Sequence, residues 1–173
     1  KMSQTQVERL FIKDRTSLMH DVFRLHANIA STSSASPTDF TSNLVRSNDS
    51  LAGQLGTGMS ESSGIFTFPS TGIYKITANI QFLRNNSAIG YGGVYIMSTS
   101  NNFTSEDALG DNFGSVDNVA SHYANVVTHG IYDVTDLTNN KVKFKYQFSH
   151  GFTIAADTDA NYTYFMFEKL GET

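Results

Sequence analysis

The residue types that most often carry out catalysis are sparse in this sequence and are not spaced for it. The chain has no cysteine, which removes a thiol nucleophile, and no serine lies in a Gly-x-Ser-x-Gly turn. No histidines have the His-x-His or His-Glu-x-x-His spacing of a zinc site, so surface or interface positions are favoured for them. The five histidines are His20, His26, His122, His129 and His150. The sequence therefore predicts a protein that is not an enzyme, with no catalytic residue, no metal site and no cofactor.

Two acidic groups come nearest to a calcium site. Asp157-Thr-Asp159-Ala-Asn161 has the Asp-x-Asp-x-Asn start of a calcium loop, but Tyr162 stands where that loop requires a glycine. Glu168 follows in an aromatic segment that should point its carboxylate away from the loop. The second group comprises Glu106, Asp107, Asp111 and Asp117. In both places a solvated turn is favoured over calcium binding.

Three lysines, Lys141, Lys143 and Lys145, line one face of a predicted strand, because they alternate with apolar residues over 141–148. They fit a solvated edge, or a counter-charge for acidic loops of a neighbouring subunit. A polyanion-binding strip is the alternative, but three lysines without arginine support it weakly. The net charge of −4 also argues against nucleic acid as a partner.

The stretch 63–82 reads as strand, tight turn and strand. A short aromatic and β-branched run opens at Gly64, and Pro69 marks its end because proline cannot donate to a strand ladder. The second run alternates apolar and polar residues from Tyr74 to Phe82, so one of its faces should lie in a core.

The segment Gly-Ile-Phe-Thr-Phe-Pro-Ser-Thr-Gly-Ile-Tyr, from Gly64 to Tyr74, resembles the signature of the C1q-like domain of the TNF/C1q superfamily. There a Gly-x-Phe-Thr-x-Pro-x-x-Gly-x-Tyr pattern links two strands of a jelly roll. The preceding residues 55–63 are similar to versions of this module in virion proteins of tailed phages, especially those of marine cyanobacteria. The resemblance implies an all-β, ten-stranded antiparallel jelly-roll sandwich that forms a homotrimer.

Size and composition agree with one β-rich domain. A chain of 173 residues can bury roughly 70% of the surface that its unfolded form exposes, and it contains 13 phenylalanines and 8 tyrosines. No apolar run approaches the roughly 20 residues of a membrane helix, so membrane insertion is not expected. We assign residues 21–173 to the jelly-roll domain. Residues 1–20 are assigned to an N-terminal arm, either a short helical stalk or an extended segment.

The remaining strands are expected at a spacing of about 8 to 12 residues, as in a sandwich or jelly roll. Loops are expected at 31–36 and 51–63, a short edge strand near Phe40 or Leu44, and the longest turn-rich segment at 101–118. The predicted strands are 21–29, 91–98, 121–132, 142–148, 151–156 and 162–170, in addition to the two that flank the turn at 69–72.

The last strand carries hydrophobic residues on both sides. Tyr164 and Met166 face one way, and Phe165 and Phe167 face the other. Because a strand of a monomeric two-sheet sandwich has only one buried face, we place these four residues at a trimer interface, with burial under a loop as the alternative. The resemblance implies an inner sheet around a threefold axis, formed by 21–29, 72–82, 142–148 and 162–170.

These observations predict a non-enzymatic, trimeric structural or binding protein located in the virion of a tailed phage. It would be a fibre or spike head that contacts a host glycan or receptor, or a capsid or tail decoration bound to other virion proteins. Phe103, Phe113 and Tyr123 are the expected binding-loop residues, because aromatic rings stack on sugars. Leu10 and Phe11 are the expected anchor of the arm. A secreted C1q-like or TNF-like recognition protein of a cellular organism is the alternative.

Overall fold

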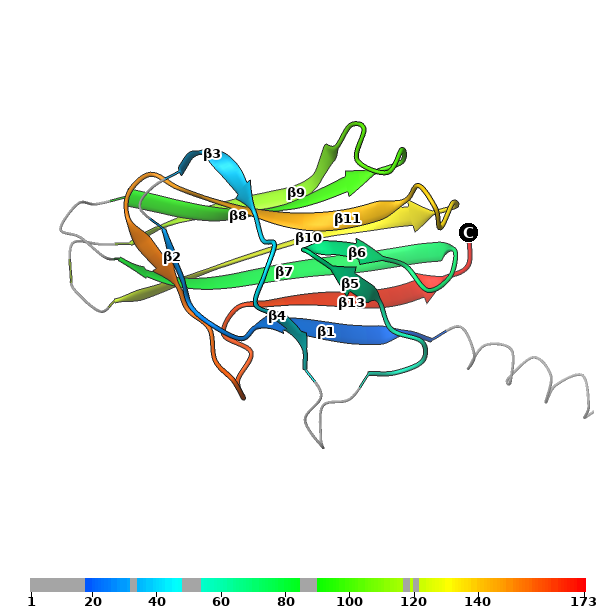
Figure 1. The fold of residues 1–173 in the computed structure, drawn as a ribbon, viewed down its shortest axis with the longest axis horizontal. Coiled ribbons are helices and arrows are strands. Elements are labelled where there is room, and N and C mark those ends of the chain that lie inside the picture. Colours follow the sequence, from blue (N-terminus) through cyan, green and yellow to red (C-terminus); the bar gives the residue numbers. More distant parts are fainter. Residues whose placement is uncertain (1–17, 32–33, 48–53, 85–89, 117–118, 120–121) are drawn as a thin grey trace, which may run out of the picture.

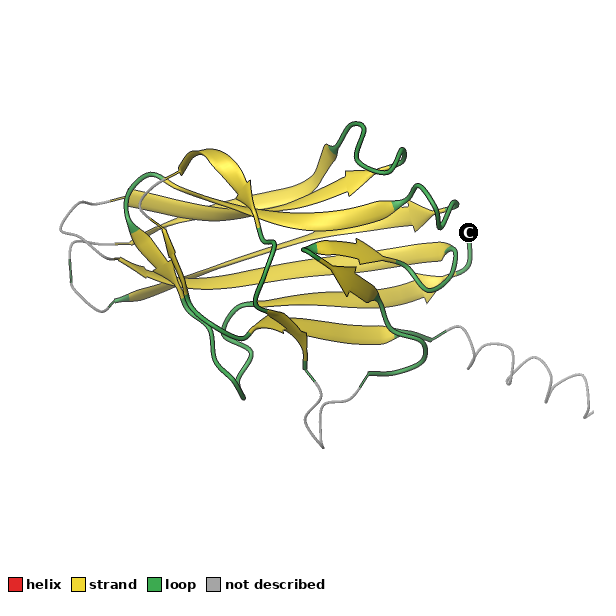
Figure 2. Cartoon of the chain, in the orientation of Figure 1, coloured by secondary structure: helices red, strands yellow, loops and turns green. Residues whose placement is uncertain are grey.

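The computed structural model describes residues 18–31, 34–47, 54–84, 90–116, 119 and 122–173. These residues form thirteen strands and no helix, arranged as two antiparallel sheets packed face to face (Figures 1 and 2). None of them belongs to a helix long and apolar enough to cross a membrane. The predicted arm, with Leu10 and Phe11, lies outside the described residues except for its last three positions.

The strands, in chain order, are β1 (His20–Leu25), β2 (Ile29–Ser31), β3 (Ser34–Asp39), β4 (Leu44–Arg46), β5 (Ser60–Ser62), β6 (Ile65–Thr67), β7 (Gly72–Arg84), β8 (Gly90–Thr99), β9 (Asp107–Val116), β10 (Tyr123–Val134), β11 (Lys141–Phe148), β12 (Phe152–Ile154) and β13 (Tyr164–Gly171). Five of these, β2, β4, β5, β6 and β12, have only three residues each, which is why the total exceeds the predicted ten.

Several strands that are consecutive in the sequence lie in different sheets. The seven-stranded sheet has the order β2-β12-β7-β13-β1-β4, with β10 also paired to β7, and the six-stranded sheet has the order β5-β6-β11-β8-β9, with β3 also paired to β11. The chain passes repeatedly from one sheet to the other, as Figure 1 shows for β6, β7 and β8. An antiparallel sandwich with these crossings is a jelly roll.

The turn at 69–72 joins the two sheets and does not form a hairpin. β6 pairs with β5 and β11, whereas β7 pairs with β13, β10 and β12. Gly64 has a φ of +85°, and a Cβ there would lie 1.7 Å from the carbonyl oxygen of Phe40. Tyr74 is fully buried, and its hydroxyl donates to the carbonyl oxygen of Ser70 at 2.9 Å. Tyr74 therefore holds the crossover between the sheets, whereas Gly64 lets the turn between β5 and β6 pass close to Phe40.

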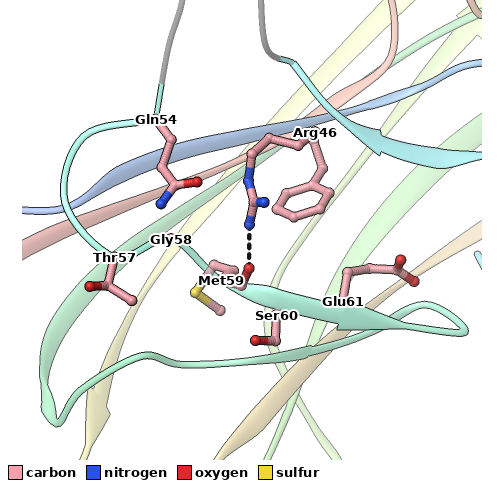
Figure 3. Close-up of a pocket in the computed structure, with 8 residues that line it drawn as sticks. Arg46, Gln54, Thr57, Gly58, Met59, Ser60 and Glu61 are labelled. Carbon is pink, nitrogen blue, oxygen red and sulfur yellow. Dashed lines mark hydrogen bonds between the residues drawn. The ribbon is translucent and has the colours of Figure 1, made fainter.

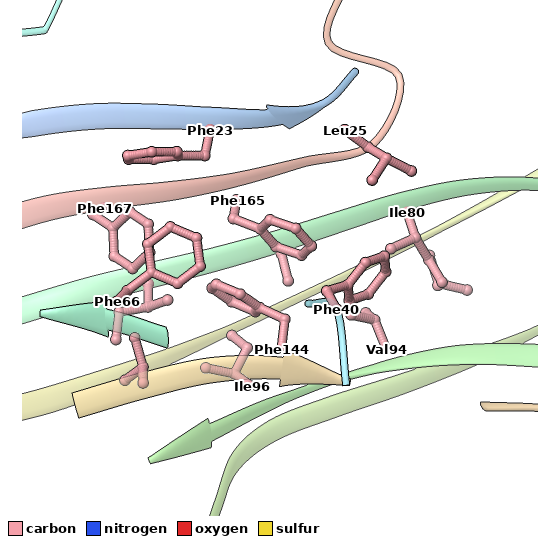
Figure 4. Packing of buried hydrophobic residues seen from close by; sticks show 14 of the residues in the cluster. Phe23, Leu25, Phe40, Phe66, Ile80, Val94, Ile96, Phe144, Phe165 and Phe167 are labelled. Atoms are coloured by element: carbon pink, nitrogen blue, oxygen red, sulfur yellow. The ribbon is translucent and has the colours of Figure 1, made fainter. Parts of the chain in front are cut away.

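Aromatic side chains fill the space between the sheets (Figure 4). Phe144 of β11 stacks on Phe165 of β13 with ring centroids 3.9 Å apart, and Phe66 packs against Phe167 at 5.0 Å. Phe23 meets Phe66 edge to face at 5.0 Å. Contacts of this kind, made from both sheets, hold the sandwich closed without a disulfide.

The predicted inner sheet needs one correction. β1, β7 and β13 share the seven-stranded sheet as expected, but the strand predicted at 142–148 does not join them. β11 belongs to the six-stranded sheet, where it pairs with β8 from Lys141 opposite Thr99 to Phe148 opposite Gly92. The place beside β7 is taken by β10, which pairs with it over twelve residues. An alternating pattern identifies a strand but does not determine which of the two sheets receives it.

Three expected loops contain strands, and the shortest of these is β5, inside the segment 51–63. The turn-rich segment 101–118 includes β9, a ten-residue strand at the edge of the six-stranded sheet, so only 100–106 forms the loop after β8. β3 begins inside the loop predicted at 31–36 and contains Pro37. All three strands lie at the margin of the six-stranded sheet, where polar residues can face solvent and the proline of β3 removes no needed donor.

Candidate functional site

β13 presents its two sides to different surroundings. Phe165 and Phe167 are fully buried between the two sheets, in contact with Phe144 and Phe66 (Figure 4). Their predicted place at a trimer interface is therefore wrong, because the chain's own second sheet already covers them. Tyr164 and Met166 lie on the outer face of the seven-stranded sheet and are half-buried. They stay candidates for a contact with another chain.

The outer face of the seven-stranded sheet carries hydrophobic side chains across several strands. Val22 lies opposite Met166 and Met166 opposite Thr77, while Tyr164 lies opposite Asn79 and Asn79 opposite Val127. Val127 is 47% exposed and Ile131 is 52% exposed on the same face of β10. Among the described residues, the buried hydroxyl of Thr77 has no hydrogen-bond partner. Half-covered apolar groups beside an unsatisfied hydroxyl are the features of a surface that another chain covers.

The three predicted binding-loop residues do not form one site. Tyr123 is the first residue of β10 and pairs with Leu83 of β7. Phe113 is in β9 and pairs with Gly93 of β8. Phe103 lies in the loop that follows Thr99, the last residue of β8, whereas Phe113 lies beside Gly93 of the same strand. Thr99 is six positions after Gly93, which corresponds to roughly 20 Å along the strand. The structure therefore separates Phe103 from Phe113 and Tyr123.

Phe113 belongs to an aromatic group on the outer face of the six-stranded sheet. Its ring meets Tyr91 at 5.8 Å and Tyr95 at 5.3 Å, both edge to face. The Tyr95 hydroxyl donates to Gln147 Oε1 at 2.7 Å. Desolvation, followed by the charge of Asp111, raises the pKa of Tyr95, so the hydroxyl stays neutral. Tyr91 and Phe113 are 46% and 38% exposed, so they form a small aromatic patch.

The lysines of β11 are neutralised within the same chain. Lys143 Nζ lies 2.7 Å from Glu106 and 3.0 Å from Asp39, and Lys145 contacts the same two carboxylates. Desolvation raises the pKa of Glu106, but hydrogen bonds and charges from Lys143 and Lys145 outweigh it, and the net pKa is lowered. The Nζ of Lys143 also lies 4.9 Å from the centre of the Phe103 ring. A strip already paired with two carboxylates is a poor polyanion site.

The polar groups of the calcium-like loop form hydrogen bonds within the chain. Asp157 Oδ1 accepts the N–H groups of Asp159 and Ala160, at 2.7 and 2.8 Å, and these bonds lower the pKa of Asp157. The guanidinium of Arg24 donates to the carbonyl oxygens of Thr158 and Asp159. Within the described residues, no three carboxylate, histidine or cysteine side chains gather as a metal site would need.

A pocket of about 540 Å³ opens at the edge of the sandwich beside β4 and β5 (Figure 3). We call it the Arg46 pocket. It is lined by Phe23, Arg46, Gln54, Thr57, Gly58, Met59, Ser60 and Glu61. None of these residues was predicted as a site, although most of them belong to the segment 55–63. Its volume is within the range of small-molecule sites.

Arg46 is held rigidly in this pocket. Its Nε donates to Asp21 Oδ1 at 2.9 Å, and its Nη2 donates to Asp21 Oδ2 at 3.1 Å and to the carbonyl oxygen of Met59. Asp21 is completely buried and also accepts the Met59 N–H at 2.8 Å. The guanidinium lies 4.8 Å from the centre of the Phe23 ring. A Cβ on Gly58 would come within 2.3 Å of Asp21 Oδ2, so glycine at this position lets the loop pass close to the ion pair.

Solved structures of TNF proteins have the same fold as this chain. Eiger TNF from S. frugiperda superposes with a TM-score of 0.63 at 10% identity, covering 91% of this chain and 95% of that one. Murine APRIL at pH 5.0 superposes with a TM-score of 0.62 at 12% identity, covering 88% of this chain and 99% of that one. No family model matches the sequence, and no curated protein matches it either.

These likenesses establish a TNF-like jelly roll and confirm the predicted fold class. Identities of 10–13% extend no further than the fold. Assembly, partners and biological setting must therefore be argued from the surfaces described above.

Proposed function

We propose that the protein is a non-enzymatic, homotrimeric recognition module whose subunits meet through the outer face of the seven-stranded sheet. The observation that carries the proposal is the hydrophobic outer side of β13 and β10. Tyr164 and Met166 are half-buried there, Val127 and Ile131 are exposed, and the Thr77 hydroxyl is buried without a partner among the described residues. An interface of at least about 2,000 Å², apolar at its centre, would cover this face.

Polar residues at one end of the same face would orient the subunits. Glu168 lies 3.5 Å from Lys75 and 3.9 Å from His20, in a row that ends at Ile131. All three side chains keep more than a third of their surface exposed, so they leave hydrogen-bonding capacity for a neighbouring subunit. Charges of this kind contribute mainly to the choice of orientation.

The proposed setting is the virion of a tailed phage, as a fibre or spike head or as a capsid or tail decoration. The support is the resemblance of residues 55–63 to phage virion modules and the polar, cysteine-free composition. In this setting Leu10 and Phe11 would anchor the arm to other virion proteins, and Phe113 and Tyr123 would belong to the host-facing end. A secreted recognition protein is the second candidate, supported by the shared TNF-like fold.

The trimer is tested by Val127→Asp, which places a charge at an exposed hydrophobic position of the proposed contact. The native protein should have three times the mass of the 19.0 kDa chain in light scattering at micromolar concentration, and the variant should dissociate into folded monomers. Ser115→Asp, at an exposed position of β9 in the other sheet, is the matched control and should stay trimeric. A native protein that is monomeric at this concentration would refute the proposal.

The virion setting is tested separately by removing residues 1–17, which takes away Leu10 and Phe11 but keeps Met19 in the core and His20 in β1. A phage carrying the truncated gene should assemble particles that lack this protein, while the purified truncated chain still forms the trimer. If the truncated protein were incorporated at the native level, the arm would not be the anchor.

A further inference from the structure

We propose that the Arg46 pocket binds a neutral saccharide unit. The inference names the ligand class of the recognition module proposed above, and so it rests on that function.

Arg46 has an N–H donor, on Nη1, that is available to a ligand. Three of the Arg46 hydrogen bonds go to the carboxylate of Asp21 and one to the Met59 carbonyl, all from Nε and Nη2. Among the described residues nothing accepts from Nη1, and the Arg46 side chain keeps 34% of its surface exposed. A guanidinium fixed on one edge and open on the other is a preorganised donor, so little side-chain entropy is lost when a ligand binds.

Two other side chains that line the pocket, Gln54 and Glu61, carry open acceptor atoms (Figure 3). Gln54 uses its Nε2 to donate to the Gly56 carbonyl at 2.7 Å, which leaves its amide oxygen open. Glu61 Oε1 accepts the Gly64 N–H at 2.7 Å, which leaves Oε2 open. Sugar hydroxyls can both accept, as from Arg46, and donate, as to these oxygens, and the exposed Thr57 and Ser60 hydroxyls add further partners.

The charges in the pocket favour a neutral ligand. Asp21 neutralises Arg46 at 2.9 Å, and Glu61 then leaves the pocket with one unbalanced negative charge. An anionic ligand would be repelled by Glu61, whereas a neutral polyol makes the same hydrogen bonds without that penalty. The Asp21–Arg46 pair fits this role, because two N–H groups of the guanidinium donate to the two oxygens of the carboxylate and so fix its orientation.

The experiment titrates the intact protein with the methyl glycosides of glucose, galactose and mannose, and with glucuronate and glucosamine as charged probes. Binding is followed by NMR on the side-chain amide of Gln54 and the Hε of Arg46. We expect at least one neutral glycoside to shift both signals with millimolar affinity, and glucuronate to bind more weakly. Gln54→Ala should weaken that affinity about tenfold, as the loss of one hydrogen bond does. Asn102→Ala, an exposed amide outside the pocket, should not change it.

Glu61→Gln is the decisive second variant, because it keeps the acceptor for the Gly64 N–H and removes the charge. It should raise the affinity for glucuronate relative to the neutral sugar. The proposal is overturned if no neutral glycoside shifts the Gln54 signal, if glucuronate binds more tightly than every neutral probe, or if both variants leave the affinities unchanged. Light scattering on the same samples separates the two proposals: a trimer without sugar binding removes only the pocket, and a sugar-binding monomer removes only the trimer.

Discussion

Two groups of paired charges differ in almost every physical respect. Asp21 and Arg46 form a single pair at the edge of the sandwich, with the carboxylate fully buried and its oxygens held by Arg46 and the Met59 N–H. Asp39, Glu106, Lys143 and Lys145 form a network on the outer face of the six-stranded sheet, where each lysine has two carboxylates within reach.

The difference indicates two roles. In the network each charge has an alternative partner and access to water, so losing one member leaves no isolated charge in a dry place. In the Asp21–Arg46 pair the loss of the arginine would leave a carboxylate with no exposed surface and no counter-ion. The network is a solvated surface in which the carboxylates neutralise the lysines and so disfavour polyanion binding. The Asp21–Arg46 pair is a fixed element of the pocket.

The largest expected effect comes from the same substitution made in both regions. Arg46→Met should destabilise the protein by about 3–5 kcal/mol, because it leaves Asp21 buried and uncompensated. Lys143→Met should lower stability by only about 0.2–1 kcal/mol, because Lys145 still serves both carboxylates. Urea unfolding at a fixed protein concentration measures both values. Equal losses in the two variants would contradict the distinction between the regions.

The sequence could have indicated the pair, although it was not recognised. The alternation of Phe23 and Leu25 places Asp21 on the inward side of the same strand, where a carboxylate needs a cation. The identity of that cation could not be predicted, because Arg46 reaches Asp21 only through the pairing of β4 with β1. The network was missed for the same reason, since Asp39 and Glu106 are remote from the lysines in sequence.

The fold was the more predictable part. The signature at 64–74 and the alternation in β7, β11 and β13 identify an all-β jelly roll, because local pattern reports strands directly. The sequence could not show which side of β13 faces the core, because this is decided by the position of the six-stranded sheet, which covers Phe165 and Phe167 and leaves Met166 on the outer side. Two hydrophobic sides look alike in a sequence when one is covered by the chain itself.

Titration of Glu106 should give a smaller effect, confined to the network. Its folded pKa is lowered, so its contribution to stability is present above the unfolded value of about 4.3 and is lost as the pH falls through the folded pKa. Lys143 has a raised folded pKa, so its contribution is present below about 10.4 and is lost as the pH rises through the folded pKa. Glu106→Gln should therefore be less stable than the native protein at neutral pH by about 0.2–1 kcal/mol.

The measurement is urea unfolding of both proteins from neutral pH down to about pH 2, where unfolded Glu is protonated. The difference between them should shrink to zero at the acid end. A difference that persisted there would mean that Glu106 acts through packing and not through its charge.

A substitution with an effect of similar size tests the contact between Lys143 and Phe103. Phe103 sits at a positive φ of 63° in the loop after β8, with the lysine Nζ 4.9 Å from its ring centre. Phe103→Leu keeps an apolar side chain and removes the ring, so it should lower stability by about 0.5–1 kcal/mol at low salt, as expected of a partly exposed cation–π contact. In the background of Lys143→Met the same substitution should lose most of that effect. A double-mutant cycle from urea unfolding gives the coupling energy. A coupling energy of zero would mean that the Phe103 ring does not interact with Lys143 and is not part of the charge network.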